Sequence, residues 1–147
     1  MALLVRLLET ASIDPDAIPL VPQDLTQREY FGPDAPHHGR LSWSLPALEI
    51  VNWVRACDFL PFRSPWAYPR ATTGDTEVGI VKARLTRRPC EGPPGTVGSL
   101  DASGAHLACA DEWIVVSRLT MEDRYVSPSD VLKPGDRLKD GKWENSR

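Results

Sequence analysis

Four short segments in the second half of the chain have the composition of β-strands and are separated by turn signals. Residues 111–112 form a two-residue hairpin connection, and residues 102–104 mark another turn. Several short strands at this spacing predict a small, open β-barrel. One helical turn at 129–132 and a last short strand after the 134–135 turn complete the pattern. The four expected strands cover residues 77–85, 96–100, 105–110 and 113–119.

Residues 44–57 carry the clearest helical pattern of the chain. Ser44 is the expected N-cap, and Pro46 is tolerated in the first turn because an N–H there would be unsatisfied anyway. Apolar side chains recur at helical spacing along one face, so that face is expected to be buried. They are Ala47, Ile50, Val51, Val54 and Cys57.

The N-terminal third of the chain predicts a short helix followed by a long connection. Residues 2–10 carry a leucine stripe at helical spacing, and such a short helix is marginal without a surface to bury that stripe. Residues 19–43 contain four prolines and predict a linker, with Tyr30 and Phe31 as its anchors on the body. Residues 61–70 predict a Pro-rich loop. The stripe consists of Leu3, Leu4, Leu7 and Leu8.

These elements together define the expected fold class and domain organisation. The fold is mainly β: an OB-like open β-barrel preceded by an N-terminal helix, a wrapping linker and a second helix. We expect the helix and linker over residues 1–43 and the helix plus barrel over 44–140. Residues 141–147, which contain Trp143, are expected to be a flexible tail.

Composition excludes several classes of protein. The 147 residues suffice for one domain, and the net charge is −3, so this is not the strongly basic body of a typical nucleic-acid binder. Residues 1–35 carry −4 and residues 36–147 carry +1. Three well-separated cysteines favour free thiols in a reducing compartment. The apolar run at 1–8 is too short for a signal peptide or a membrane span, so we expect a cytoplasmic protein without membrane contact.

The order of the motifs resembles one known family. The series is similar to the C-terminal region of methionyl-tRNA formyltransferase and of related sugar-nucleotide formyltransferases, over roughly residues 3–138. The chain departs from the family where many members have a Pro-Gly-Ala run, because here residues 61–67 read Pro-Phe-Arg-Ser-Pro-Trp-Ala. The elements that carry the resemblance are Gln23, Tyr30-Phe31, Gly39-Arg40-Leu41-Ser42-Trp43, Ala47, Glu49-Ile50-Val51-Asn52, Val54-Arg55-Ala56, Pro61, Ser64-Pro65-Trp66, Pro94-Gly95-Thr96-Val97, Ala108-Cys109-Ala110-Asp111 and Gly135-Asp136-Arg137-Leu138.

The resemblance implies a role without chemistry of its own. The family's catalytic domain is Rossmann-like, binds 10-formyltetrahydrofolate, and uses an Asn, a His and an Asp for positioning, charge stabilisation and proton transfer. In the family this trio precedes the helix that matches residues 2–10. The resemblance therefore implies that residues 1–43 correspond to the end of that domain, and that this chain holds no catalytic residue and binds no cofactor itself.

Seven residues are candidates for binding. Asn52 and Arg55 share a flank of the 44–57 helix and could touch an acceptor phosphate, or tie the helix to the linker. The basic run at 82–88 could contact a nucleic-acid backbone, or be a solvated edge that resists strand pairing. Trp66, in the Pro-rich loop, is the best exposed aromatic for a partner, whereas Trp43, Trp53 and Trp113 are expected to pack in the core or under the linker. The basic run is Lys82, Arg84, Arg87 and Arg88.

Three functional hypotheses follow. The first is a non-catalytic formyltransferase module that positions an acceptor or braces a catalytic domain, with the leucine stripe as the contact to that domain or to a second copy. The second is a stand-alone barrel that binds a nucleotide, tRNA or a carrier protein. The third is a small enzyme that uses His37 and His38; a solvated pair is favoured, because no third ligand at a helpful spacing supports a metal site.

Overall fold

The computed structural model describes residues 2–18, 22–29 and 36–141. The chain divides into two compact units, Met1–Gly32 and Pro33–Arg147, which are described separately below. The predictions that concern Tyr30, Phe31 and Trp143 lie outside the described residues.

The first unit contains one α-helix and two short 3-10 turns. Helix α1 spans Ala2–Ile13, three residues beyond the expected end, and its leucines are exposed within this unit. The 3-10 turns Pro15–Ala17 and Leu25–Gln27 each follow an aspartate whose side chain accepts a backbone N–H, as N-caps do. Part of the predicted linker therefore has local structure of its own.

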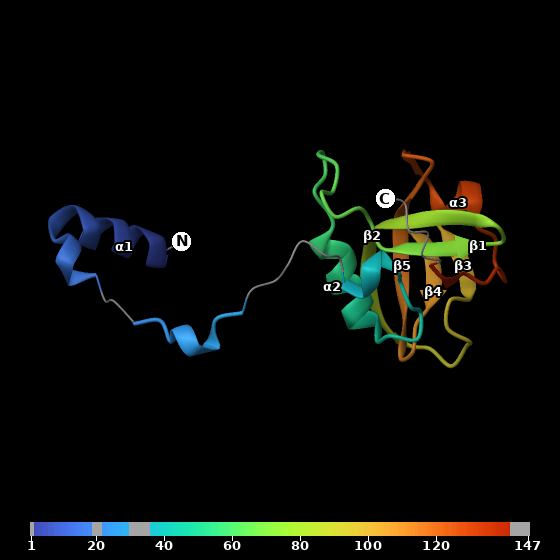
Figure 1. The fold of residues 1–147 in the computed structure, drawn as a ribbon, viewed down its shortest axis with the longest axis horizontal. Coiled ribbons are helices and arrows are strands. Elements are labelled where there is room, and N and C mark those ends of the chain that lie inside the picture. The colour runs from blue at the N-terminus through green and yellow to red at the C-terminus, as the bar shows by residue number, and fades with distance from the viewer. Residues whose placement is uncertain (1, 19–21, 30–35, 142–147) are drawn as a thin grey trace. The chain divides into compact units, whose positions relative to one another are not determined.

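The second unit is built around an antiparallel sheet of seven strands (Figure 1). The strand order is β3-β4-β5-β2-β1-β7, and β6 pairs with β5. The prediction of a mainly β, barrel-like fold is confirmed. The strands are β1 (Arg70–Thr73), β2 (Thr76–Pro89), β3 (Val97–Asp101), β4 (Gly104–Ala108), β5 (Glu112–Met121), β6 (Arg124–Val126) and β7 (Lys139–Asp140).

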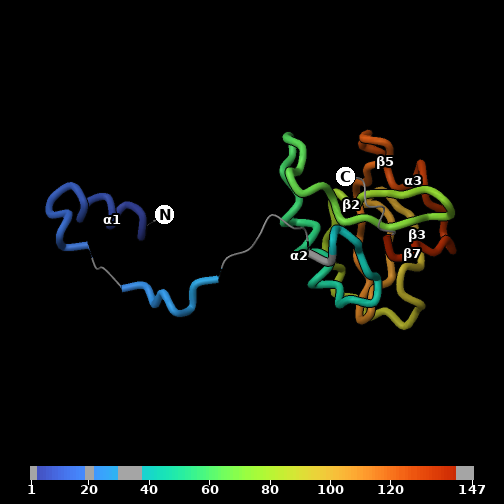
Figure 2. Tube along the Cα trace, in the orientation of Figure 1, coloured from blue at the N-terminus to red at the C-terminus, as the bar shows by residue number. Residues whose placement is uncertain are grey.

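The segment 135–140 connects the two edges of this sheet. Gly135 N donates to Val97 O and Val97 N donates to Asp136 O, both at 2.8 Å, on the β3 side. The chain then continues into β7, which pairs with β1 on the other side; Figure 2 traces this return of the C-terminal segment to β3. The sheet therefore curls into a half-barrel that this segment bridges.

Two strands were not predicted from the sequence. Arg70 was assigned to a loop but begins β1, and β6 was not predicted at all. Both are short and carry exposed polar residues, so neither shows the alternation that marks longer strands. Strand β2 is longer than expected because it continues through a bulged, strongly basic stretch to Pro89. The expected helical turn is α3, Pro128–Val131, with a capping box at Ser127.

Helix α2, Ala47–Ala56, packs its predicted apolar face into the core. Trp43 and Trp53 also belong to that core, but Trp113 is only half-buried and covers Gly98 on β3 instead. The end of the predicted linker joins the same core, because Leu41 is fully buried and its N–H donates to Arg70 O at 2.9 Å. Gly141 is buried as well.

The prediction that Ser44 is the N-cap of α2 is wrong. Pro46 occupies the N-cap position and makes no side-chain cap, while Ser44 is exposed. The capping carboxylate comes from the β4–β5 hairpin: Asp111 Oδ1 accepts the N–H of Ala47 at 2.8 Å and that of Glu112 at 2.9 Å. A carboxylate at this end of a helix is also favoured by the helix dipole.

We expect Asp111→Ala to destabilise the second unit by about 1–2 kcal/mol, because it removes a charged N-cap and leaves the Ala47 N–H without its acceptor. Urea unfolding and amide exchange at Ala47 measure the effect. Glu91→Ala, which removes an exposed carboxylate in a loop, is the matched control. Equal midpoints for the two variants would contradict the capping role.

Candidate functional site

One candidate site is a small basic pocket between α2 and the middle of β2. Arg55, Lys82 and Arg84 line it together with Asp58 and Ser117, around a volume of about 220 Å³. Lys82 Nζ lies 3.7 Å from Asp58 Oδ2. Among the described residues, Arg55 and Arg84 have no carboxylate within ion-pair distance. The pocket can therefore offer positive charge to an anion.

The structure does not bring the whole basic run together. Arg87 adopts a φ of 61°, and the register of β2 against β5 shifts between Leu85 and Pro89. Arg87 and Arg88 are exposed near the end of β2, where Pro89 pairs with Glu112, and they do not line the basic pocket. Asn52 is exposed on α2 and does not line it either.

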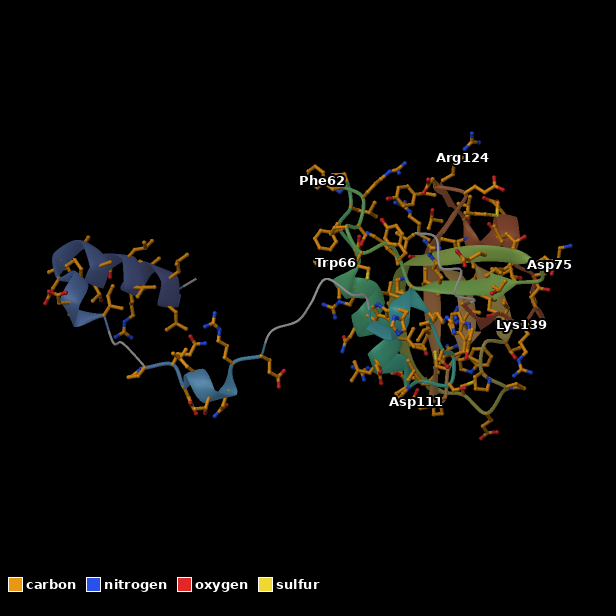
Figure 3. The ribbon with its side chains drawn as sticks, viewed as in Figure 1. Phe62, Trp66, Asp75, Asp111, Arg124 and Lys139 are labelled. Carbon is orange, nitrogen blue, oxygen red and sulfur yellow. The ribbon has the colours of Figure 1, made fainter. Side chains whose placement is uncertain are left out.

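The barrel unit carries a second and larger candidate site. It is an open cleft of about 700 Å³ between the loop that follows α2 and the β5–β6 hairpin. Trp66 stands beside it in the loop, 47% exposed, and its ring centroid is 5.3 Å from that of Phe59. Figure 3 shows Trp66 and Phe62 at the end opposite Asp111. The basic pocket and this cleft share no lining residue.

Two tyrosines form a bridge across the cleft. The hydroxyls of Tyr68 and Tyr125 are 2.9 Å apart, and the rings meet edge to face with centroids 6.3 Å apart. Burial, followed by the hydrogen bond to Tyr125, raises the pKa of Tyr68 to about 12. Next to them, Arg70 Nη1 donates to Glu77 Oε1 at 2.8 Å.

The raised pKa of Tyr68 gives a pH prediction. Its folded-state pKa lies above the unfolded value, so this contribution to stability is complete below about pH 10 and is lost as the pH rises towards 12. Tyrosinate absorbance during a pH titration should show one tyrosine that ionises late. Tyr68→Phe should remove that step, and Tyr125→Phe should shift it to lower pH; an unchanged step in both variants would contradict the assignment.

Sequence reasoning singled out Trp66 but missed the tyrosine pair. Tyr68 was inside the predicted Pro-rich loop, and Tyr125 lies on the unpredicted strand β6. The sequence shows only that each segment contains an aromatic residue, and this does not predict that the rings of Tyr68 and Tyr125 are in contact.

The described residues assemble neither a metal site nor the family's Asn, His and Asp trio. No group of three His, Cys, Asp or Glu side chains among them could hold a metal ion. His38 lies in the 3-10 turn Pro36–Gly39. His106 Nε2 lies 2.8 Å from Asp101 Oδ2 at the β3–β4 turn, and no asparagine shares that turn, so the described residues do not fit the family's trio.

Two of the three free thiols, Cys57 and Cys109, have raised pKa values. Cys57 and Cys109 are buried and Cys90 is half-buried. Burial raises the pKa of the Cys57 thiol; burial, together with the nearby Asp111 carboxylate, raises that of Cys109 to about 12. Thiols with raised pKa values are poor nucleophiles at neutral pH.

Comparison with known proteins assigns the family. The profile described as formyl transferase, C-terminal domain matches residues 35–133, and the chain therefore belongs to this family. Methionyl-tRNA formyltransferase of Pseudomonas putida is 30% identical over 82 residues, which are 56% of this chain and 24% of the relative. The enzyme of Paraburkholderia phymatum is 27% identical over 99 residues, covering 67% and 28%.

The fold has a counterpart among solved structures. HypX from Aquifex aeolicus, crystallised in complex with tetrahydrofolic acid, matches 96% of this chain and 27% of its own with a TM-score of 0.53 at 14% identity. That likeness confirms the fold. The chain thus spans about a quarter of the length of the proteins it matches. Among the described residues, no helix has the length and apolarity needed to cross a membrane.

Proposed function

We propose that this chain is a non-catalytic C-terminal module of a formyltransferase, acting in the cytoplasm, which positions an acceptor substrate or braces a catalytic domain that uses 10-formyltetrahydrofolate. The observation that carries the proposal is the match of residues 35–133 to the C-terminal domain of the family. The described residues lack the assembled Asn, His and Asp that the chemistry requires. The proposed contribution is therefore binding and orientation.

The leucine stripe of α1 supports the bracing role. Leu3, Leu4, Leu7 and Leu8 are 48–84% exposed within their own unit. Four large apolar side chains on one short helix are a surface that gains stability when another surface covers it. A formyltransferase catalytic domain is the proposed cover, and a second copy of the chain is the other candidate.

A capture experiment from the source cell tests this role. The full chain is the bait, and the eluate is assayed for formyl transfer from 10-formyltetrahydrofolate. We expect the wild type to retain that activity and Leu4→Lys with Leu8→Lys to lose it. Glu9→Lys, exposed on the face of the same helix away from the stripe, makes the same change of charge; it is the control and should retain the activity.

Two results would contradict the bracing role. One is an eluate without formyl-transfer activity. The other is equal retention of activity by the leucine variant and by its control. Sedimentation of the isolated chain separates self-association from capture, because a dimer that the leucine variant abolishes would assign the stripe to a second copy.

The alternative function is a stand-alone barrel that binds a nucleotide, tRNA or a carrier protein. The observation that favours its nucleic-acid version is the basic pocket, in which three cations face one carboxylate. An anionic group bound there would relieve the repulsion between Arg55, Lys82 and Arg84. Phosphate contacts of this kind make binding depend strongly on salt.

Binding of unfractionated tRNA at several salt concentrations tests the alternative. If the pocket contacts phosphates, Lys82→Gln with Arg84→Gln should weaken binding and reduce the slope of log K against log salt by about 1–2. Arg124→Gln with Lys133→Gln removes the same charge from exposed positions elsewhere in the barrel unit and is the control. Binding that ignores salt, or equal losses in both pairs, would exclude the phosphate contact.

A further inference from the structure

We propose that the cleft between the 59–70 loop and the β5–β6 hairpin, here called the aromatic cleft, binds an extended proline-containing segment of a partner protein that carries a basic side chain. This inference does not depend on the proposed function, because it uses neither α1 nor the basic pocket. It rests on the distribution of exposed rings, on how firmly the cleft is held, and on its charge.

Exposed aromatic side chains concentrate at this one end of the barrel unit. Among the described residues of the unit, five large apolar or aromatic side chains are exposed, and four of them are rings in the 59–66 loop or on β6. Clustered exposed rings mark interaction surfaces, whereas scattered apolar residues are ordinary. The four are Phe59 at 38%, Phe62 at 75%, Trp66 at 47% and Tyr125 at 45%. Of these, Tyr125 lines the cleft, and Trp66 lies in the chain between the lining residues Pro65 and Ala67.

The walls of the cleft are tied to each other. The hydroxyl contact between Tyr68 and Tyr125 joins the loop to the hairpin across the cleft. Tyr68 also lies against the backbone of Gly79, where a Cβ would be 3.2 Å from its own Cβ and only 2.6 Å from the Thr120 methyl. The glycine therefore lets the ring lie close to the sheet. A cleft held in this way loses little conformational entropy when it binds.

The residues that line the cleft favour a cationic partner over an anionic one by their charge, and Arg118, which lies over the Tyr125 ring at 6.0 Å from its centroid, is outside that lining. The lining carries Arg63 and Arg70 against the carboxylates of Glu77, Glu122 and Asp123, a net charge of −1. Arg70 is engaged by Glu77 at 2.8 Å. Arg63 and Asp123 are 4.0 Å apart with side chains 81% and 86% exposed, so a partner's cation can replace Arg63 at little cost.

The same charge disfavours a nucleic acid, although aromatic rings can stack on bases. Phosphates would approach Glu122 and Asp123 on the hairpin turn, whereas Arg55 and Arg84 line a different pocket. A proline-rich segment fits better: its extended polyproline conformation is formed before binding, and aromatic-lined grooves accept it.

A peptide titration of the full chain tests the proposal. The probe is acetyl-Pro-Leu-Pro-Pro-Leu-Pro-Arg-amide, followed by calorimetry and by chemical shifts of the cleft residues. We expect saturable binding below millimolar concentration and a loss of about tenfold or more for Trp66→Ala, the size typical of a ring that anchors an interface. Exchanging the probe's arginine for glutamate should weaken binding further than exchanging it for glutamine.

Variants elsewhere control for general damage. Leu48→Ser changes the fifth exposed apolar side chain, which lies on α2 outside the cleft, and should bind the probe as the wild type does. Glu122→Lys with Asp123→Lys should weaken binding several-fold, whereas Asp75→Lys on the β1–β2 turn should not.

Each remaining outcome would overturn the proposal. Absence of saturable binding by the probe rejects a proline-dependent site. Equal affinity of the wild type, Trp66→Ala and Tyr125→Ala rejects the cleft as its location. A single-stranded RNA that competes with the probe assigns the cleft to nucleic acid. A concentration-dependent dimer that Trp66→Ala abolishes assigns the cleft to a second copy of the chain.

Discussion

Gly95→Ala should destabilise the barrel unit by about 3–5 kcal/mol. Gly95 has a φ of 83°, and a Cβ there would collide with the carbonyl oxygen of Leu138. The backbone cannot move aside without loss, because Gly95 N donates to Ala108 O and Leu138 N donates to Gly95 O, both at 2.9 Å. Chemical denaturation of wild type and variant measures the difference.

Gly135→Ala is the matched control for this substitution. Gly135 has a φ of 90°, yet no atom lies within 4 Å of the position that a Cβ would occupy. It therefore reports the conformational cost of an L-residue alone, about 1–2 kcal/mol. If the two variants unfold at the same denaturant concentration, the contact between Gly95 and the 135–140 segment does not limit stability.

This contact explains why the Pro-Gly-Thr-Val motif and the Gly-Asp-Arg-Leu motif belong to one pattern. Gly95 and Leu138 are 43 residues apart and meet where the C-terminal segment bridges the curled sheet. A sequence reading can recognise the two motifs and their order. It cannot show that each supplies a backbone partner to the other, because no side-chain pattern encodes that pairing.

The strands that could be predicted are those whose side chains alternate or form apolar runs. Val78 and Ile80 on β2 and Ile114 and Val116 on β5 face the core, and their period of two was visible in the sequence. Strand β1 was missed because its position depends on pairing with β2 and β7, not on its own composition. The strand conformation of β1 therefore depends on its tertiary pairing and not on local sequence preference.

The candidate sites show the same limit. Arg55 and Trp66 were singled out by residue type, and both are exposed as a binding role requires. Sequence proximity grouped Lys82 and Arg84 with Arg87, but the shift in register near the end of β2 separates them. Spacing along a strand predicts a shared face only where the strand has no bulge.

Trp43→Ala should cost about 3–5 kcal/mol of the unfolding free energy, close to the effect of Gly95→Ala. The Trp43 side chain is 1% exposed and belongs to the core cluster beneath α2. Its Cδ1 lies near Gly95, so the indole also supports the point where the 135–140 segment bridges the sheet. Truncation would leave a large cavity at that point.

Trp43→Phe separates the ring from its polar atom. The buried Nε1 of Trp43 has no hydrogen-bond partner among the described residues, so a phenyl ring loses volume but also removes an unsatisfied donor. The backbone N–H of residue 43 still donates to Asp140 Oδ1 at 3.0 Å in either variant. We therefore expect phenylalanine to recover more than half of the loss caused by alanine, measured by urea unfolding. A phenylalanine variant as unstable as the alanine variant would contradict this expectation, because it would mean that the indole N–H of Trp43 stabilises the fold.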